Sequence, residues 1–124
     1  MDFNKNLKIC VIGCGSIGTE IAFAVCSGRV PNMTVQSIFD IDKARTRKLL
    51  SVLNEDIIIS DSITEIINDE KIDLVVECVS PSFVSNNGIE ILQSGISMLI
   101  LSSGALIDKN FYEKVNQACN LKDV

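Results

Sequence analysis

The strongest constraint on the fold is a regular alternation of apolar runs with segments of helical periodicity. The apolar runs that predict β-strands are residues 7–12, 33–39, 56–60, 73–79 and 96–101. The segments that predict helices are residues 16–26, 42–53, 62–68, 80–94 and 108–120. Because these strands are apolar throughout, helices must cover both faces of their sheet. The pattern predicts an α/β fold built on a doubly wound parallel sheet.

The length of the chain sets the number of domains and strands that we expect. A chain of 124 residues has the size of one ordinary domain. About five strands in the order 3-2-1-4-5 would make a Rossmann fold that stops before a sixth strand.

Composition excludes several classes of partner. The net charge of −5 and the lack of a basic patch argue against nucleic acid. Residues 1–7 lack the apolar core of a signal peptide, and no apolar run has the length of a membrane span, so we expect a cytoplasmic protein with no membrane partner. The five cysteines are odd in number and show no C-x-x-C spacing, which predicts reduced thiols and no metal site.

A glycine motif, IGCGSIG at residues 12–18, joins the first predicted strand to the first predicted helix. In a dinucleotide-binding fold Gly13 makes the sharp turn, Gly15 lets the backbone approach a diphosphate, and Gly18 allows the helix to pack on the strand. The backbone amides from Gly15 to Gly18, including those of Ser16 and Ile17, would then face the phosphates. A tight turn with no ligand is the alternative.

Asp40 ends the second predicted strand, 22 positions after Gly18. An acidic residue at about this distance meets the adenosine ribose hydroxyls, which favours NAD over NADP. Lys43 and Arg45 follow closely and would help to accept a 2′-phosphate, so NADP stays open; alternatively, they only flank a helix start.

The ends of the fourth and fifth strands should meet the same crevice. They carry CVSP at residues 78–81 and SSGAL at residues 102–106, and Ser80 either lines the crevice or only caps its helix. Glu77 is unusual in an apolar strand, and we expect it near the crevice or paired with Lys or Arg. Cys78 is a poor candidate nucleophile because the chain has no histidine to activate it.

The segments IGCGSIG, FDID, VVECVSP and above all LSSGALIDKNFYEKV resemble the N-terminal NAD(P)-binding domain of L-aspartate dehydrogenases, relatives of homoserine dehydrogenase. The resemblance covers residues 7–119 and implies oxidation of L-aspartate to iminoaspartate with NAD or NADP, feeding pyridine nucleotide biosynthesis. It also implies phosphate contacts at Gly13 to Gly18, a ribose contact at Asp40, and cofactor contacts near Val79, Ser80 and Ala105.

Members of that family continue into a second domain that supplies the substrate pocket, the dimer contact and a catalytic histidine. We therefore expect residues 1–124 to be the NAD(P)-binding domain, with no catalytic residue of their own and no turnover alone. A bare fifth-strand edge would favour self-association, so a homo-oligomer is possible. The alternatives are a stand-alone NAD-binding sensor and the cofactor domain of another amino-acid dehydrogenase, such as homoserine dehydrogenase.

Overall fold

A computed structural model describes residues 2, 4–53 and 56–124. Its strands are β1 (Leu7–Ile12), β2 (Met33–Phe39), β3 (Ile58–Ile59), β4 (Leu74–Glu77) and β5 (Ser97–Ile100). Its helices are α1 (Ser16–Cys26), α2 (Lys43–Leu50), α3 (Ile63–Asn68), α4 (Pro81–Gln93), the 3₁₀ helix η1 (Ser103–Ile107) and α5 (Lys109–Lys122). Every predicted element is present, several with shorter bounds, and η1 is an element that the sequence pattern did not predict.

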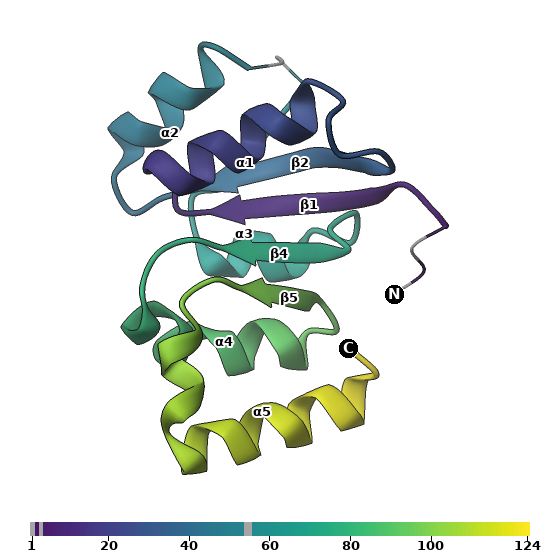
Figure 1. Ribbon diagram of the computed structural model, residues 1–124, viewed down its shortest axis with the longest axis vertical. Coiled ribbons are helices and arrows are strands. Elements are labelled where there is room, and N and C mark those ends of the chain that lie inside the picture. The colour runs from purple at the N-terminus through teal and green to yellow at the C-terminus, as the bar shows by residue number, and fades with distance from the viewer. Residues whose placement is uncertain (1, 3, 54–55) are drawn as a thin grey trace.

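The five strands form one parallel sheet in the order β3-β2-β1-β4-β5, which confirms the predicted Rossmann topology (Figure 1). From β1 the chain adds β2 and then β3 on one side, and then crosses to the other side of β1 to add β4 and β5. The strand order therefore switches between β1 and β4. In such a sheet the crevice outside the carboxyl ends of these two strands is where a ligand binds. The turns that follow β1, β2, β4 and β5 therefore define the region of interest.

Two apolar clusters cover the two faces of the sheet. One joins α1 and α2 to β1 through residues that include Ala22, Leu49 and Val11. The other joins α3 and α4 to the opposite face of β1, where Cys10 and Ile12 point. This sidedness explains why β1 is apolar at nearly every position, as the sequence pattern required.

A register shift between β1 and β2 keeps their side chains on matching faces. Ile9 pairs with Val35, whereas Cys10 pairs with Ser37, so Gln36 is an extra residue in β2. Successive side chains in a strand alternate between the two faces of the sheet, so one extra residue moves every later side chain of β2 to the other face. Ile12 and Phe39, which pair at the end of the two strands, therefore point to the same face. The bulge thereby sets the positions of the residues that follow Ile12 and Phe39.

The first turn of α1 differs from that of the other α-helices. Asp42, Ser62, Ser80 and Asp108 each accept a hydrogen bond from a backbone amide in the first turn of α2, α3, α4 and α5, respectively. The N-cap of α1 is Gly15, and no side chain caps this helix. Its first amides have no partner within the helix, as at any helix start, and they face the crevice.

The third strand is shorter than predicted, because only Ile58 and Ile59 of residues 56–60 pair with β2.

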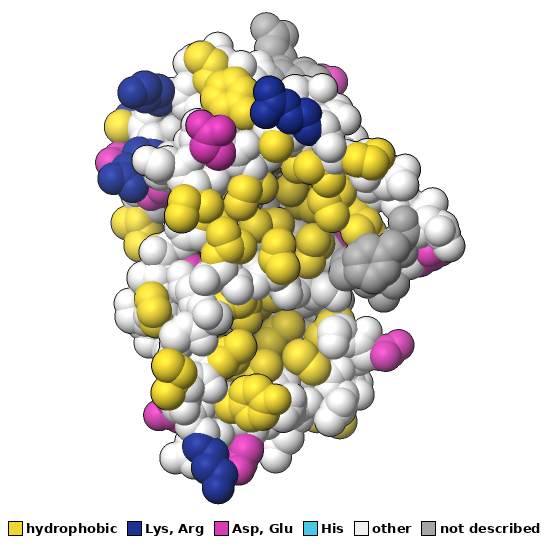
Figure 2. Space-filling model, in the orientation of Figure 1, with side chains coloured by type: hydrophobic (Ala, Val, Ile, Leu, Met, Phe, Trp, Pro, Cys, Tyr) yellow, Lys and Arg dark blue, Asp and Glu magenta, His cyan; other side chains and the backbone are white. Residues whose placement is uncertain are grey.

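At the opposite edge of the sheet, β5 pairs only with β4 among the described strands, and Leu99 and Leu101 expose 53% and 41% of their surfaces. Figure 2 shows apolar side chains gathered over the middle of the face that is turned to the viewer in Figure 1.

Among the described residues, no helix has both the length and the apolar character that crossing a bilayer requires.

Candidate functional site

The turn after β1 needs glycine at two of its three glycine positions for reasons internal to the protein. Gly13 has φ +97°, and a Cβ atom there would lie 2.7 Å from the carbonyl oxygen of Cys78. A Cβ atom on Gly18 would lie 1.7 Å from the carbonyl oxygen of Gly13. The first glycine thus permits the sharp turn and the third permits close packing of α1 on β1, in agreement with the roles that the motif predicted.

Gly15 has no such internal requirement. Its φ of −78° is ordinary for any residue, and the nearest atom to an added Cβ is Nη1 of Arg45, at 3.5 Å. A side chain would therefore fit in the folded chain, at the N-cap position of the uncapped helix α1. The amides of Ser16 and Ile17 lie in that first turn, and the side chain of Ile17 is 60% exposed. The geometry leaves an open, positively polarised surface at the start of this helix.

Asp40 follows β2 and holds the glycine turn in place. Its Oδ2 accepts a hydrogen bond of 2.8 Å from the Cys14 amide, and its Oδ1 accepts one of 2.8 Å from the Asp42 amide. The side chain is only partly buried. A carboxylate has about four acceptor positions, so both oxygens keep the capacity to accept a hydroxyl from a ligand.

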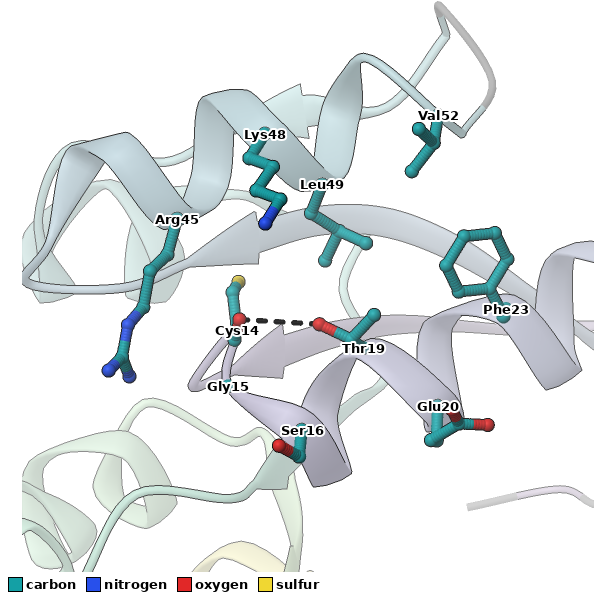
Figure 3. Close-up of a pocket in the computed structure, with 10 residues that line it drawn as sticks. All are labelled: Cys14, Gly15, Ser16, Thr19, Glu20, Phe23, Arg45, Lys48, Leu49 and Val52. Atoms are coloured by element: carbon teal, nitrogen blue, oxygen red, sulfur yellow. Dashed lines mark hydrogen bonds between the residues drawn. The ribbon is translucent and has the colours of Figure 1, made fainter.

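The two cations near Asp40 have different surroundings. Lys43 pairs with Asp61 at 3.6 Å, whereas Arg45 pairs with Asp42 at 3.8 Å. The side chain of Arg45 extends from α2 beside Gly15 (Figure 3). Both ion pairs are well exposed, so each contributes little to stability. Of these two cations, Arg45 is therefore the one that lies beside the glycine turn.

A cleft of about 740 Å³ between α1 and α2 opens beside this turn and was not predicted (Figure 3). Arg45 and Lys48 of α2 reach toward its glycine end, and Phe23 and Val52 line the other end. It includes Gly15 and Ser16 of the predicted site. Its remaining walls are side chains of two helices whose packing the sequence pattern does not specify.

The turns after β4 and β5 lie side by side at the same edge of the sheet and are joined by Glu77. This side chain is fully buried and accepts hydrogen bonds from the amides of Val79, Ser80 and Ser102 and from the Ser102 hydroxyl. We expected Glu77 near the crevice or paired with Lys or Arg; it lies at the crevice, and its partners are backbone amides and a hydroxyl. These partners come from two turns separated by a helix, so the sequence could not indicate them.

The remaining predicted residues lie around these two turns. Val79 is 43% exposed, and its Cγ2 is 3.0 Å from where a Gly13 Cβ would be, so it borders the glycine turn. Ser80 caps α4 by accepting from the Phe83 amide at 3.1 Å. Ala105 lies in η1 and is buried, with 6% of its surface exposed. Val79 is thus the most accessible of the three.

The thiols of the site are poorly suited to nucleophilic chemistry. Burial raises the pKa of Cys14 to about 12, with a further contribution from the negative charge of Asp40. Burial, followed by the charge of Glu77, raises the pKa of Cys78 to about 11. Both groups are protonated near neutral pH. No set of three or more His, Cys, Asp or Glu side chains in the described part of the chain could hold a metal ion.

A parallel sheet in this order, with an uncapped glycine turn after β1 and an acid after β2, defines a dinucleotide-binding domain of the dehydrogenase class. Residues 13–124 match the family model described as homoserine dehydrogenase, NAD binding domain. The chain belongs to this family of NAD-binding domains.

The relatives found by sequence confirm the resemblance to L-aspartate dehydrogenases. The L-aspartate dehydrogenase of Nitrosopumilus maritimus is 33% identical over 114 residues, which are 91% of this chain and 41% of the relative. That of Methanocaldococcus jannaschii is 36% identical over 111 residues, which are 88% of this chain and 40% of the relative. The chain thus spans about two-fifths of the length of these curated relatives.

Solved structures share the fold at lower sequence identity. A UDP-N-acetylglucosamine 3-dehydrogenase from Acidithiobacillus ferrooxidans superposes with a TM-score of 0.79 and 17% identity, over 95% of this chain and 36% of that one. A probable dehydrogenase from Thermotoga maritima gives a TM-score of 0.76 and 24% identity, over 90% of this chain and 34% of that one. These similarities support the fold and carry no information on the substrate.

Proposed function

We propose that this chain is the cofactor-binding part of an L-aspartate dehydrogenase. The whole enzyme would convert L-aspartate and NAD(P) to iminoaspartate and NAD(P)H, with release of a proton. The names of the sequence relatives support this substrate, and the family match supports the cofactor. The substrate pocket and the catalytic acid or base of such an enzyme would belong to the three-fifths of the relatives' length that has no counterpart in these 124 residues.

Gly15 is the observation that carries the proposed site. The folded chain has space for a side chain at this position, so the glycine is explained by a ligand that must approach the backbone. The uncapped start of α1 offers the amides of Ser16 and Ile17 to an anion. An acidic protein can hold a diphosphate in this way because backbone amides, rather than lysines, make the contacts.

The other predicted residues would hold the two nucleoside halves. Asp40 would accept hydrogen bonds from the adenosine ribose, while keeping its bonds to the Cys14 and Asp42 amides. Val79, the Ser80 hydroxyl and the turn that contains Ala105 would border the nicotinamide half. Bound NAD supplies a hydride acceptor, and these residues bind and orient it.

Cofactor preference depends on a balance between Asp40 and Arg45. The carboxylate accepts from a ribose 2′-hydroxyl and repels a 2′-phosphate, whereas the guanidinium of Arg45 would attract that phosphate. Lys43 is occupied with Asp61 and has the smaller influence. We propose NAD as the preferred cofactor, with NADP accepted more weakly.

Titration calorimetry with the isolated chain tests the site. Asp40→Ala should raise the Kd for NAD by about tenfold or more, because a hydrogen bond to a charged group contributes about 1.5–3 kcal/mol. The variant also loses the bond to the Cys14 amide that holds the glycine turn, which weakens both cofactors, but the Kd for NADP should rise less because repulsion of the 2′-phosphate disappears as well. Arg45→Ala is the matched control and should weaken NADP more than NAD. Equal losses for both cofactors in Asp40→Ala would contradict the ribose assignment.

The cofactor part of a homoserine dehydrogenase is the second candidate, because the family description names that enzyme. The complete protein distinguishes the two when NADH formation is followed at 340 nm with each amino acid. Turnover of L-aspartate but not of homoserine supports the proposal. Turnover of homoserine but not of L-aspartate supports the alternative. The 124-residue chain should turn over neither, because it corresponds to about two-fifths of the relatives' length and contains no histidine to act as the catalytic group that the resemblance implies.

A further inference from the structure

Glu77 is a fully buried carboxylate at the carboxyl end of β4. Its Oε2 accepts from the Val79 amide at 2.7 Å, the Ser80 amide at 3.1 Å and the Ser102 hydroxyl at 2.8 Å. Its Oε1 accepts from the Ser102 amide at 2.9 Å. One side chain thus holds the turn between β4 and α4 against the turn between β5 and η1.

These bonds occupy amides that would otherwise be free at the edge of the sheet. The amides of Val79 and Ser80 bond to Glu77, whereas α1 keeps its first turn open. The amides of Val79 and Ser80 are therefore already bound to an internal anion and are not available to a second one. The two sides of the crevice differ: the β1 side attracts negative charge and the β4–β5 side already contains it.

Within the described part of the chain, no cation is paired with this buried carboxylate. Neither ion pair among residues 2, 4–53 and 56–124 includes Glu77, and all its hydrogen-bond partners are uncharged donors. Its field reaches the neighbouring side chain, since it contributes, after burial, to the raised pKa of Cys78. A charge that is buried without a counterion acts over a longer distance than an exposed one.

We propose that Glu77 is a positioning residue that fixes the two turns beside the nicotinamide half and favours the oxidised, cationic dinucleotide over the reduced, neutral one. The inference rests on the proposed function, because the diphosphate at Gly15 and the ribose at Asp40 would direct the other half of the cofactor toward β4 and β5. The nicotinamide ring of NAD⁺ carries a positive charge that NADH lacks. The buried carboxylate would therefore attract only the oxidised ring.

Calorimetric titration of wild type and Glu77→Gln with three ligands tests this proposal. Glutamine can present its oxygen to the three donors that now bond to Oε2, while its NH2 group faces the Ser102 amide and loses that one bond. Most of the geometry is thus kept while the charge is removed. The Kd for NAD⁺ should rise by about tenfold relative to that for NADH, a factor typical of one charge acting within a partly screened interior. The Kd for ADP-ribose, which has no nicotinamide, should change by less than about twofold.

Glu90→Gln is the matched control, since it removes the same charge from an exposed position on α4. It should leave all three Kd values unchanged. Equal weakening of NAD⁺ and NADH by Glu77→Gln would overturn the charge preference. Failure of the wild type to bind ADP-ribose would instead refute the proposed function, so the two failures are distinguishable.

A measurement on the wild type keeps the proposal testable if Glu77→Gln does not fold. With the carboxylate in place, NAD⁺ should bind at least as tightly as NADH. A wild type that binds NADH more than tenfold tighter than NAD⁺ would overturn the proposal without any variant. If the variant folds, its Cys78 thiol should also react with iodoacetamide at lower pH than in the wild type, because the negative charge beside it is gone.

Discussion

Replacement of Gly18 by alanine should destabilise the protein, although alanine is the better helix former. An added Cβ would lie 1.7 Å from the Gly13 carbonyl oxygen and 2.8 Å from its carbon. Real Cβ contacts essentially never fall below 3.0 Å, so the helix start must move by at least 1.3 Å, the difference between 3.0 and 1.7 Å. The Gly13 oxygen and carbon are backbone atoms and the added Cβ is bonded directly to the backbone, so no side-chain rotation relieves the contact.

The size of the effect follows from what that movement disturbs. α1 buries Ala22 and Val25 against the sheet, and shifting it opens gaps in this cluster. Overpacking of this kind costs about 1–3 kcal/mol, and the absence of a flexible partner places Gly18 near the upper end. Alanine recovers about 0.5–1 kcal/mol of helix propensity. We therefore expect a net loss of about 2 kcal/mol from a free energy of unfolding of about 5–15 kcal/mol.

Urea unfolding followed by circular dichroism measures this loss. With a slope of about 1–3 kcal/mol per molar urea, the midpoint for Gly18→Ala should fall by roughly 0.7–2 M. Gly88→Ala is the matched control, because an added Cβ there meets only Val84 and Phe111, at 3.5 and 3.7 Å. It should stabilise α4 by about 0.5–1 kcal/mol. A Gly18→Ala midpoint equal to or above that of the wild type would refute the packing argument.

Two further predictions concern titration and capping. Burial raises the pKa of Cys10 from 9.0 to about 12, so the folded state keeps a proton that the unfolded state loses above pH 9. The free energy of unfolding should therefore fall between pH 9 and 12, by up to about 1.4 kcal/mol per pH unit. Urea midpoints at pH 8.5 and 10.5 check this, and Cys10→Ala should reduce the decline. Asp108→Ala removes the hydrogen bond to the Phe111 amide and should cost about 1 kcal/mol. Faster amide hydrogen exchange confined to the first turn of α5 would confirm it, whereas unchanged exchange would contradict the capping role.

The sequence was sufficient for the architecture because the fold depends on local patterns. Apolar runs and helical periodicity marked the elements, and Asp42, Ser62, Ser80 and Asp108 were identified as helix starts from their positions alone. The ends of the elements are predicted less accurately than their positions. The pattern predicts a helix to Leu53 where α2 ends at Leu50. Only Ile58 and Ile59 of the third apolar run pair with β2, since the pairing partner decides where a strand stops.

The site was predictable where glycine spacing encodes it and unpredictable where distant turns meet. Gly13 and Gly18 have the structural roles that the motif implies, because their requirement for glycine arises within a few residues. The hydrogen bonds from the Ser102 amide to Glu77 and from the Cys14 amide to Asp40 span 25 and 26 positions. Strand order brings these turns to the same edge of the sheet, but it does not specify which side chain meets which amide. For Cys14 and Asp40 the contact also depends on the bulge at Gln36, which no local pattern reveals.

Calorimetric titration of Gly15→Ala with ADP-ribose and NAD⁺ tests the central claim most directly. The variant should fold, with a stability within about 1 kcal/mol of the wild type, because the added Cβ meets nothing nearer than 3.5 Å and alanine is only a poorer N-cap. If Gly15 lets a diphosphate approach the amides of α1, the Kd for both ligands should rise by at least about tenfold, since an ordered phosphate contact is lost. Gly88→Ala should bind as the wild type does. Wild-type affinity in a folded Gly15→Ala would contradict the account.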